Sequence, residues 1–203
     1  MDRLMPFDEL NIFRTMVENI YETDEKNRKR YLDFLLDDIE EILILSYLFG
    51  NEAANTMLDL DIRPEEGVVE KSVYRKIAGK DWKQRVTEYI EKETDSGKAI
   101  PLPAAVEEIM RVVETDSHRI YNEAMWNVAE TAQKRGIVIY KRWETMLDDR
   151  VRDTHLYLQG ESVPLNEYYY TYNGNYALRP GGFGVPEEDI GCRCRLVLTR
   201  AYP

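Results

Sequence analysis

The sequence predicts an α+β protein with a mostly helical N-terminal half, one long central helix and a small C-terminal β-sheet domain. Apolar residues recur at the three- and four-residue spacing of helices through the first hundred residues, and again from Val106 to Ala132. A β-branched and aromatic run follows at 137–143, and CRCRLVLT at 192–199 alternates with a period of two. Helical and strand-like patterns therefore occupy separate parts of the chain.

The N-terminal region should contain a helical hairpin followed by shorter helices. Two amphipathic segments at 10–20 and 32–43 are separated by the polar stretch ETDEKNRKR, which favours two helices joined by a turn. Asn51 can cap a third, short helix, and the apolar positions at 82–90 predict a further one. Residues 94–103 combine Ser, Gly and two prolines, so we expect a boundary there between a helical region, 1–100, and a second region, 101–203.

The second region should begin with the long central helix. Its apolar period runs from Val106 to Ala132, and Gly136 is well placed to end it. We expect strands at 137–143 and in CRCRLVLT. The stretch between them, Gln159–Pro186, is rich in Gly, Pro and Tyr and should be mostly loop, with a short strand near 162–165.

Composition narrows the possible functions. The 203 residues carry 27 Lys+Arg against 38 Asp+Glu, a formal charge of -11, which disfavours general binding to nucleic acid. Most of the excess acid lies in residues 1–100, with a net charge of -8 against -3 for 101–203. The apolar run Ile42–Phe49 is far shorter than the roughly 20 residues that span a bilayer. We therefore expect a folded protein made in the cytoplasm, without a membrane partner.

A group of polar residues in the C-terminal half forms a candidate metal site. If 148–155 is helical, Asp148, Arg152 and His155 share one face, because they are four and then three residues apart. Cys192 and Cys194 would share a face of a strand, and they are too close in sequence to serve as a disulfide staple. Two thiolates, an imidazole and a carboxylate suit tetrahedral zinc, so one hypothesis is a Zn site formed by Asp148, His155, Cys192 and Cys194.

Two other interpretations of the same residues remain open. In the first, they form an interior hydrogen-bond network in which Arg152 bridges Asp148, His155 bonds a carbonyl and the cysteines are small buried hydrophobic residues. In the second, His155 is a general acid or base and Arg152 or Arg193 stabilises a developing anion. The sequence contains no Gly-Lys-Ser/Thr phosphate loop, Gly-x-Ser-x-Gly elbow or paired-His zinc protease motif to identify a reaction.

Two further features concern interfaces and charge pairs. Tyr168, Tyr169, Tyr170 and Tyr172 form an aromatic cluster beside Asn and Gly residues, which indicates either an exposed protein interface or a lid that folds over the small sheet. On the central helix, Asp116 and Arg119 are three residues apart and can pair.

Three motifs in the second region carry a family resemblance. These are RVVETDSHRIYNEA at 111–124, KRWETMLDDRVRDTHLYLQGESVPL at 141–165 and PEEDIGCRC at 186–194. In order and spacing they resemble the phage Mu F-like family, the minor head or head-morphogenesis proteins of tailed bacteriophages, over about residues 105–198. The sequence departs from the family pattern at Asp116, where Glu is commoner, and at Gly191, where Asn is usual.

The resemblance implies a protein of the virion head that assembles in the host cytoplasm and acts in head morphogenesis. Its implied partners are the portal protein or the major capsid or scaffold protein. The C-terminal half, with Arg150, Arg152, Arg193 and Arg195 near its signature, could also contact packaged DNA. The alternative is a virion-delivered or toxin-like enzyme, a nuclease or ADP-ribosyl transferase, that uses His155 and the arginines.

Overall fold

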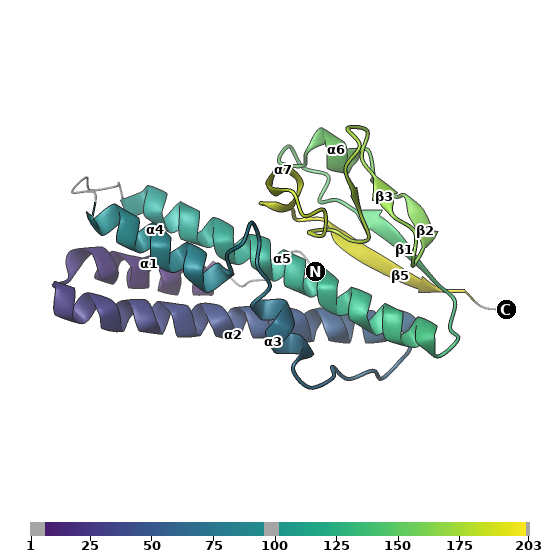
Figure 1. Ribbon diagram of the computed structural model, residues 1–203, viewed down its shortest axis with the longest axis horizontal. Coiled ribbons are helices and arrows are strands. Elements are labelled where there is room, and N and C mark those ends of the chain that lie inside the picture. Colours follow the sequence, from purple (N-terminus) through teal and green to yellow (C-terminus); the bar gives the residue numbers. More distant parts are fainter. Residues whose placement is uncertain (1–6, 96–101, 202–203) are drawn as a thin grey trace.

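The computed structural model describes residues 7–95 and 102–201. The predicted fold class is confirmed: long helices form the N-terminal part, and a small antiparallel sheet region follows them (Figure 1). The helices are α1 Phe7–Glu22, α2 Glu25–Leu58, α3 Val68–Val73, α4 Trp82–Asp95, α5 Leu102–Lys134, α6 Asp153–Leu156 and α7 Pro186–Asp189. The strands are β1 Ile139–Glu144, β2 Ser162–Pro164, β3 Tyr169–Tyr170, β4 Tyr176–Ala177 and β5 Arg195–Arg200.

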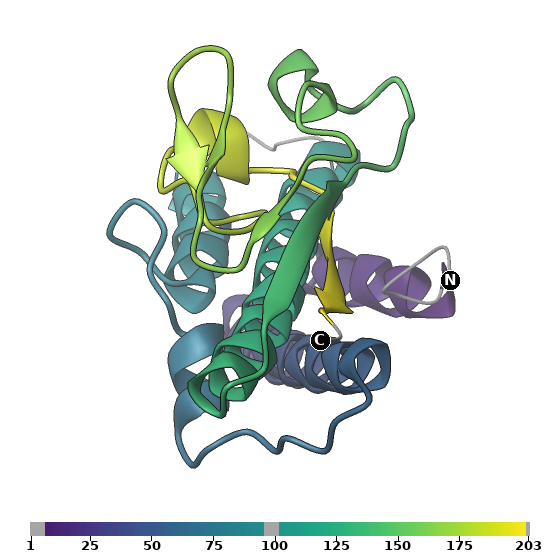
Figure 2. The same ribbon diagram turned by 90° about the vertical axis from the view of Figure 1, so that its right-hand side faces the viewer.

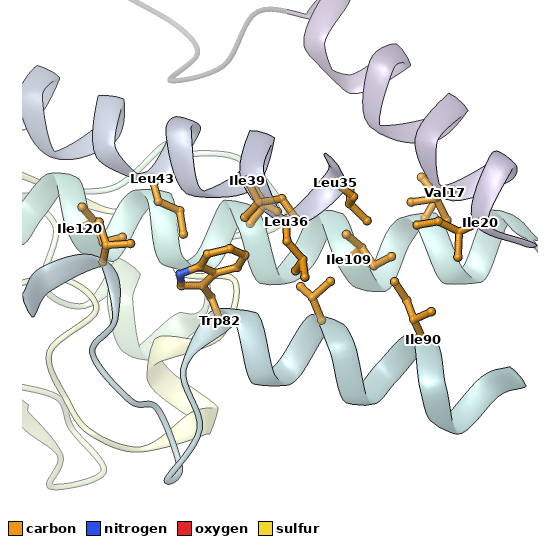
Figure 3. Packing of buried hydrophobic residues seen from close by; sticks show 14 of the residues in the cluster. Val17, Ile20, Leu35, Leu36, Ile39, Leu43, Trp82, Ile90, Ile109 and Ile120 are labelled. Atoms are coloured by element: carbon orange, nitrogen blue, oxygen red, sulfur yellow. The ribbon is translucent and has the colours of Figure 1, made fainter. Parts of the chain in front are cut away.

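Helices α2 and α5 lie side by side and form the frame of the molecule, with α1 and α4 packed along them (Figure 1). Their facing apolar stripes bury a first core, in which Ile39, Trp82 and Ile109 come from three different helices (Figure 3). A second core joins the C-terminal halves of α2 and α5 to the sheet. Both cores therefore contain residues from either side of the boundary predicted at 94–103, of which residues 96–101 lie outside the described part of the chain.

The prediction that Asn51 caps a separate short helix was wrong. Helix α2 begins after Asp24, whose side chain accepts a hydrogen bond from the Asn27 N–H, and it continues to Leu58. Asn51 lies inside it and accepts from Asn55 Nδ2 at 3.0 Å. The preceding Gly50 is buried against α5, and a Cβ atom there would lie 2.3 Å from the Tyr121 carbonyl oxygen. This glycine allows close helix packing and does not end the helix.

The sheet lies against the C-terminal half of α5 (Figures 1 and 2). Its strand order is β2-β1-β5, all antiparallel, and Trp143 faces Leu196 in the register. Alternate residues of β1, from Ile139 to Trp143, are buried, as the period of two predicts. The predicted strands near 137–143, 162–165 and the chain end are confirmed, whereas the β3–β4 hairpin lies in a stretch expected to be loop.

The predicted Asp116–Arg119 pair on α5 is buried, with exposed fractions of 0% and 3%. Arg119 donates to Asp116, to Glu123 at 3.1 Å and to the Ser72 carbonyl at 2.9 Å. Arg179, from the loop after β4, also pairs with Glu123 at 3.0 Å. This network joins α3, α5 and the C-terminal loop. Separately, no helix among the described residues has both the length and the apolar character needed to cross a membrane.

Candidate functional site

The structure brings His155, Cys192 and Cys194 together in one buried cluster. His155 Nδ1 lies 3.6 Å from the Cys192 sulfur and 3.5 Å from the Cys194 sulfur. The three ligand atoms lie within 4.8 Å of one another, and all three residues are buried. This group could hold a metal ion, because imidazole nitrogen and thiolate sulfur are the donors that zinc prefers.

Neighbouring elements fix the two cysteines in place. They lie in the extended segment just before β5, so the expectation that they belong to the strand itself was wrong. Asn122 of α5 donates to the Cys194 carbonyl at 2.9 Å and accepts from the Leu196 N–H at 2.8 Å. Gly191, with a φ of 71°, makes the turn that precedes Cys192, and its N–H donates to Thr115 Oγ1 at 2.9 Å. Helix α5 therefore holds this segment on both sides of the cluster.

The far side of the His155 ring faces a carboxylate. Nε2 lies 3.1 Å from Glu188 Oε2, within ion-pair distance, although its N–H is not aligned for a hydrogen bond. Thr154 Oγ1 donates to Glu188 at 2.8 Å, and the side-chain amides of Asn173 and Asn175 donate to it at 3.1 and 3.0 Å. Burial opposes the charge of Glu188, but the hydrogen bonds from Asn175, Thr154 and Asn173 outweigh it and lower the pKa of this carboxyl.

Aromatic rings enclose the histidine. The Trp143 ring meets that of His155 edge-on at 5.4 Å between centroids, and Phe183 stacks on it at 5.5 Å with 16° between the planes. The His155 side chain is therefore only 1% exposed. These contacts leave the Nδ1 edge, which faces the sulfurs, as the chemically available side of the ring.

The two thiols affect each other's ionisation. A hydrogen bond from Cys194, opposed by burial and assisted by His155, lowers the pKa of Cys192 well below its usual value. The same hydrogen bond, together with burial, raises the pKa of Cys194. A metal ion binds cysteine as the thiolate, so its binding would displace the protons that the two thiols carry.

Asp148 is not part of the cluster. Residues 148–151 form bends and turns, and α6 begins only at Asp153, so the helical face expected to align Asp148 with His155 does not exist. The Asp148 carboxylate instead forms a two-pronged ion pair with Arg193, at 2.6 and 2.7 Å. The hydrogen bonds from Arg193 lower the pKa of Asp148. Arg152 donates to the Ile190 carbonyl.

A small cavity adjoins the cluster. It is lined by His155, Cys192 and Cys194 together with Arg150, Arg152 and Arg193, so all three catalytic candidates of the sequence analysis border it. Its volume is about 10 Å³, roughly the space of one water molecule. Small-molecule sites typically measure about 300–1,000 Å³. A cavity of this size suits an ion and its ligands better than a bound organic substrate.

The tyrosine cluster divides into surface and core residues. Tyr170 and Tyr172 are 58% and 62% exposed and Tyr168 is 41% exposed, whereas Tyr169 is 0% exposed and packs edge-on against Trp143. Tyr176, across the hairpin, is 57% exposed and lies 5.2 Å from Tyr168 between ring centroids. Three of the four predicted interface tyrosines therefore lie at the surface, and the buried Tyr169 is inaccessible to a partner.

Sequence reasoning missed Glu188 and Asn122 as site residues. Glu188 is one of three consecutive acids in PEED, and no sequence periodicity distinguishes the two buried ones, Glu188 and Asp189, from the exposed Glu187. Asn122 does fall within the RVVETDSHRIYNEA motif, which is the signal that could have drawn attention to it.

Together, these features define a small α+β protein in which a long helix positions a buried His–Cys–Cys cluster beneath an aromatic hairpin. Residues 66–197 match the family described as Phage Mu protein F like protein, and the chain belongs to this family. The match begins within the N-terminal helical region and includes the whole cluster.

Two curated relatives match shorter parts of the chain. One is the NAD(+)–arginine ADP-ribosyltransferase EFV of Enterococcus faecalis, 33% identical over 94 residues, which are 46% of this chain and 19% of that protein. The other is minor head protein GP7 of Bacillus phage SPP1, 30% identical over 83 residues, which are 41% of this chain and 27% of that protein. The chain thus spans well under a third of either relative. No solved structure gives a significant match.

Proposed function

We propose that the protein is a minor head protein of a tailed bacteriophage that acts in head morphogenesis and binds the portal or the major capsid or scaffold protein. The observation that carries this proposal is the exposed aromatic surface of the β3–β4 hairpin, formed by Tyr168, Tyr170, Tyr172 and Tyr176, in a member of the Mu F-like family. Rigid rings with a polar edge lose little conformational freedom on docking and are enriched in protein interfaces. The likeness to a phage minor head protein supports a place in the virion head.

The helical part offers a second surface for such a partner. Helix α2 exposes Phe34, Leu48 and Phe49, at 44–50% of their surface. Between Tyr31 and Ile62 the chain contains eight acidic residues and no Lys or Arg. An apolar strip with an acidic border suits a protein partner with basic residues around its contact. A contact between the C-terminal half and packaged DNA remains part of the proposal. Its candidate residues are the exposed Arg150 and the half-exposed Arg195.

The proposed cofactor is a zinc ion held by the His155–Cys192–Cys194 cluster, which would stabilise the C-terminal part of the fold. Two buried thiols beside an imidazole, with a carboxylate behind that imidazole, support this assignment. We expect one zinc per chain in protein purified under reducing conditions, and a lower melting temperature in chelator. A metal-free protein whose melting is unaffected by chelator would contradict the zinc.

The virion role can be tested on purified particles. Mass spectrometry should detect the chain in phage heads, and its absence would contradict the proposal. The tyrosine surface is tested by replacing Tyr170 and Tyr172 together with Ser. This change should reduce incorporation of the protein into heads. It should alter the stability of the protein by no more than about 0.5 kcal/mol per residue, as surface substitutions usually do. Tyr140→Ser is the control, because Tyr140 is an exposed tyrosine, at 41%, that lies on β1, outside the cluster.

The second candidate function is enzymatic, and the likeness to an ADP-ribosyltransferase favours testing it. His155, Arg152 and Arg193 all border one cavity, as residues that act together on one substrate must do. However, the cavity is far too small for a dinucleotide, and Arg152 and Arg193 are already engaged with Ile190 and Asp148. If the protein is an enzyme, Arg193→Lys should abolish turnover of NAD or nucleic acid while the protein remains folded. The head-protein proposal predicts no such turnover in the wild-type chain.

A further inference from the structure

We propose that the zinc site has three protein ligands, His155, Cys192 and Cys194, and a fourth coordination position that is open to an exchangeable ligand from solvent. Water would fill this position in the free protein, and a small anion would replace it. This inference rests on the zinc occupancy proposed above. It also replaces the ligand set expected from the sequence, in which Asp148 was the fourth ligand.

The protein ligands leave one position of a tetrahedron unfilled. Three donor atoms, one nitrogen and two sulfurs, lie within 4.8 Å of one another. Zinc in proteins is almost always four-coordinate, and a site with three protein ligands completes its shell with water or another external group. The fourth ligand must therefore come from a further side chain or from solvent.

Three carboxylates near the cluster that could serve as a fourth ligand are committed elsewhere or out of reach. Both oxygens of Asp148 are bound by Arg193. The carboxylate of Asp189 accepts the N–H groups of Phe183 and Gly184 at 3.0 and 2.7 Å. Glu188 lies at the opposite edge of the His155 ring.

The remaining histidine, His118, is outside the group of mutually close ligand atoms in the described part of the chain. The buried Nδ1 of His118 has no hydrogen-bond partner within the described residues and its ring interacts electrostatically with Cys192, but the geometry does not place it among the ligand atoms. The two cysteines of the chain are both already in the cluster, so no third thiolate is available.

The cavity supplies the space for an external ligand. All three protein ligands line it, so the cavity adjoins the place that a bound ion would occupy. Its volume of about 10 Å³ is enough for roughly one water molecule. Zinc with two thiolates and a neutral imidazole carries no net charge. Three arginines line the same cavity; Asp148 neutralises Arg193, so the excess positive charge there comes from Arg150 and Arg152. The local field therefore favours a small anion over a neutral or cationic ligand at this position.

Glu188 acts as a positioning residue for this site. A ligating histidine usually directs its second nitrogen at a carboxylate, which fixes the ring and increases the basicity of the ligating nitrogen. Glu188 lies 3.1 Å from Nε2, within ion-pair distance, and Thr154, Asn173 and Asn175 hold it there. Replacement of such a residue typically weakens metal binding about 10–100-fold.

The experiment uses the full chain loaded with Co²⁺, whose absorption spectrum reports coordination, and titrates it with azide. We expect stoichiometric cobalt, a thiolate-to-cobalt absorption band and a saturable spectral change with azide. Asp148→Asn should give the same spectrum, metal affinity and azide response as the wild type. If cobalt binds but azide leaves the spectrum unchanged, or if Asp148→Asn alters the cobalt spectrum, the open position is refuted while the zinc proposal stands. If no metal binds, the zinc proposal itself fails.

The positioning role is tested with a matched pair on α7. Glu188→Gln should weaken cobalt and zinc affinity about 10–100-fold while keeping the thiolate band at saturation. Glu187→Gln removes the same charge from the exposed neighbouring residue and should bind metal like the wild type. Equal metal affinity in the two variants would refute a role for Glu188.

Discussion

Replacing Gly50 with Ala tests the central packing of the molecule, because two effects of known size oppose each other there. Glycine inside a helix costs about 1 kcal/mol relative to alanine, so helix propensity alone predicts that Gly50→Ala stabilises α2. In the structure, however, the new Cβ would lie 2.3 Å from the Tyr121 carbonyl oxygen and 3.0 Å from the Ala124 Cβ. The nearest obstacle is backbone, which cannot rotate away.

The two helices would have to separate by about 1 Å to restore an ordinary contact. A gap of that size forfeits roughly a quarter to a half of each dispersion contact along the shared interface. Overpacking of this kind typically costs about 1–3 kcal/mol, and the rigid backbone obstacle puts Gly50→Ala at the upper end. After the gain in propensity, we expect a net loss of about 2 kcal/mol, or roughly 4–8 °C in melting temperature for a chain of this size.

Urea and thermal unfolding of the two proteins provide the measurement. Glu52→Ala is the control, because it introduces the same residue two positions away on the exposed side of α2 and should change stability by less than about 0.5 kcal/mol. If Gly50→Ala were as stable as the wild type or more stable, the close approach of α2 to α5 would be refuted.

Three further predictions concern buried polar groups. Arg119→Met should destabilise the protein by about 1.5–3 kcal/mol in urea unfolding, since it removes buried charged hydrogen bonds to Asp116 and Glu123, which keep Arg85 and Arg179 as partners. Lys134→Met breaks an exposed pair with Glu130 and should cost under about 1 kcal/mol. Asn122→Ala should cost about 2–5 kcal/mol, because the Cys194 carbonyl and the Leu196 N–H lose their partner; a cost below about 1 kcal/mol would contradict this. The pKa of Glu188 is lowered from 4.5 on folding, so its contribution is complete above about pH 4.5 and is lost as the pH falls through the folded value. Stability measured from pH 7 to pH 3 should therefore fall more steeply for the wild type than for Glu188→Gln.

The helices were predictable from the sequence wherever burial follows a simple period. The long central helix and the strand at β1 repeat their apolar residues regularly, and both were found. Asn51 was misread because asparagine is a common helix cap. The preceding Gly50 sits inside α2 because of a contact with Tyr121, 71 residues further along the chain. Such long-range packing leaves no local pattern.

The cluster was partly predictable, for a similar reason. His155, Cys192 and Cys194 carry their chemistry in their side chains, so residue type alone was enough to select them. Asp148 was selected through an assumed helix, and that assumption failed because the chain turns at 148–151 before α6 begins. The orientation of Glu188 depends on the hairpin residues Asn173 and Asn175, which the sequence does not connect to it.

These contacts link the candidate metal site to the tyrosine surface. Glu188 faces His155 with one oxygen and accepts from Asn173 and Asn175 with the other, and these two residues lie in the turn that carries Tyr172. A metal on Nδ1 strengthens the attraction between the ring's other nitrogen and Glu188, because coordination makes that N–H more acidic. Metal binding should therefore stabilise the hairpin as well as the cluster. Because the free energy of metal binding is also folding free energy for the elements that supply the ligands, removal of the metal should increase amide exchange in the hairpin and β5 before it affects the core between α1, α2 and α4.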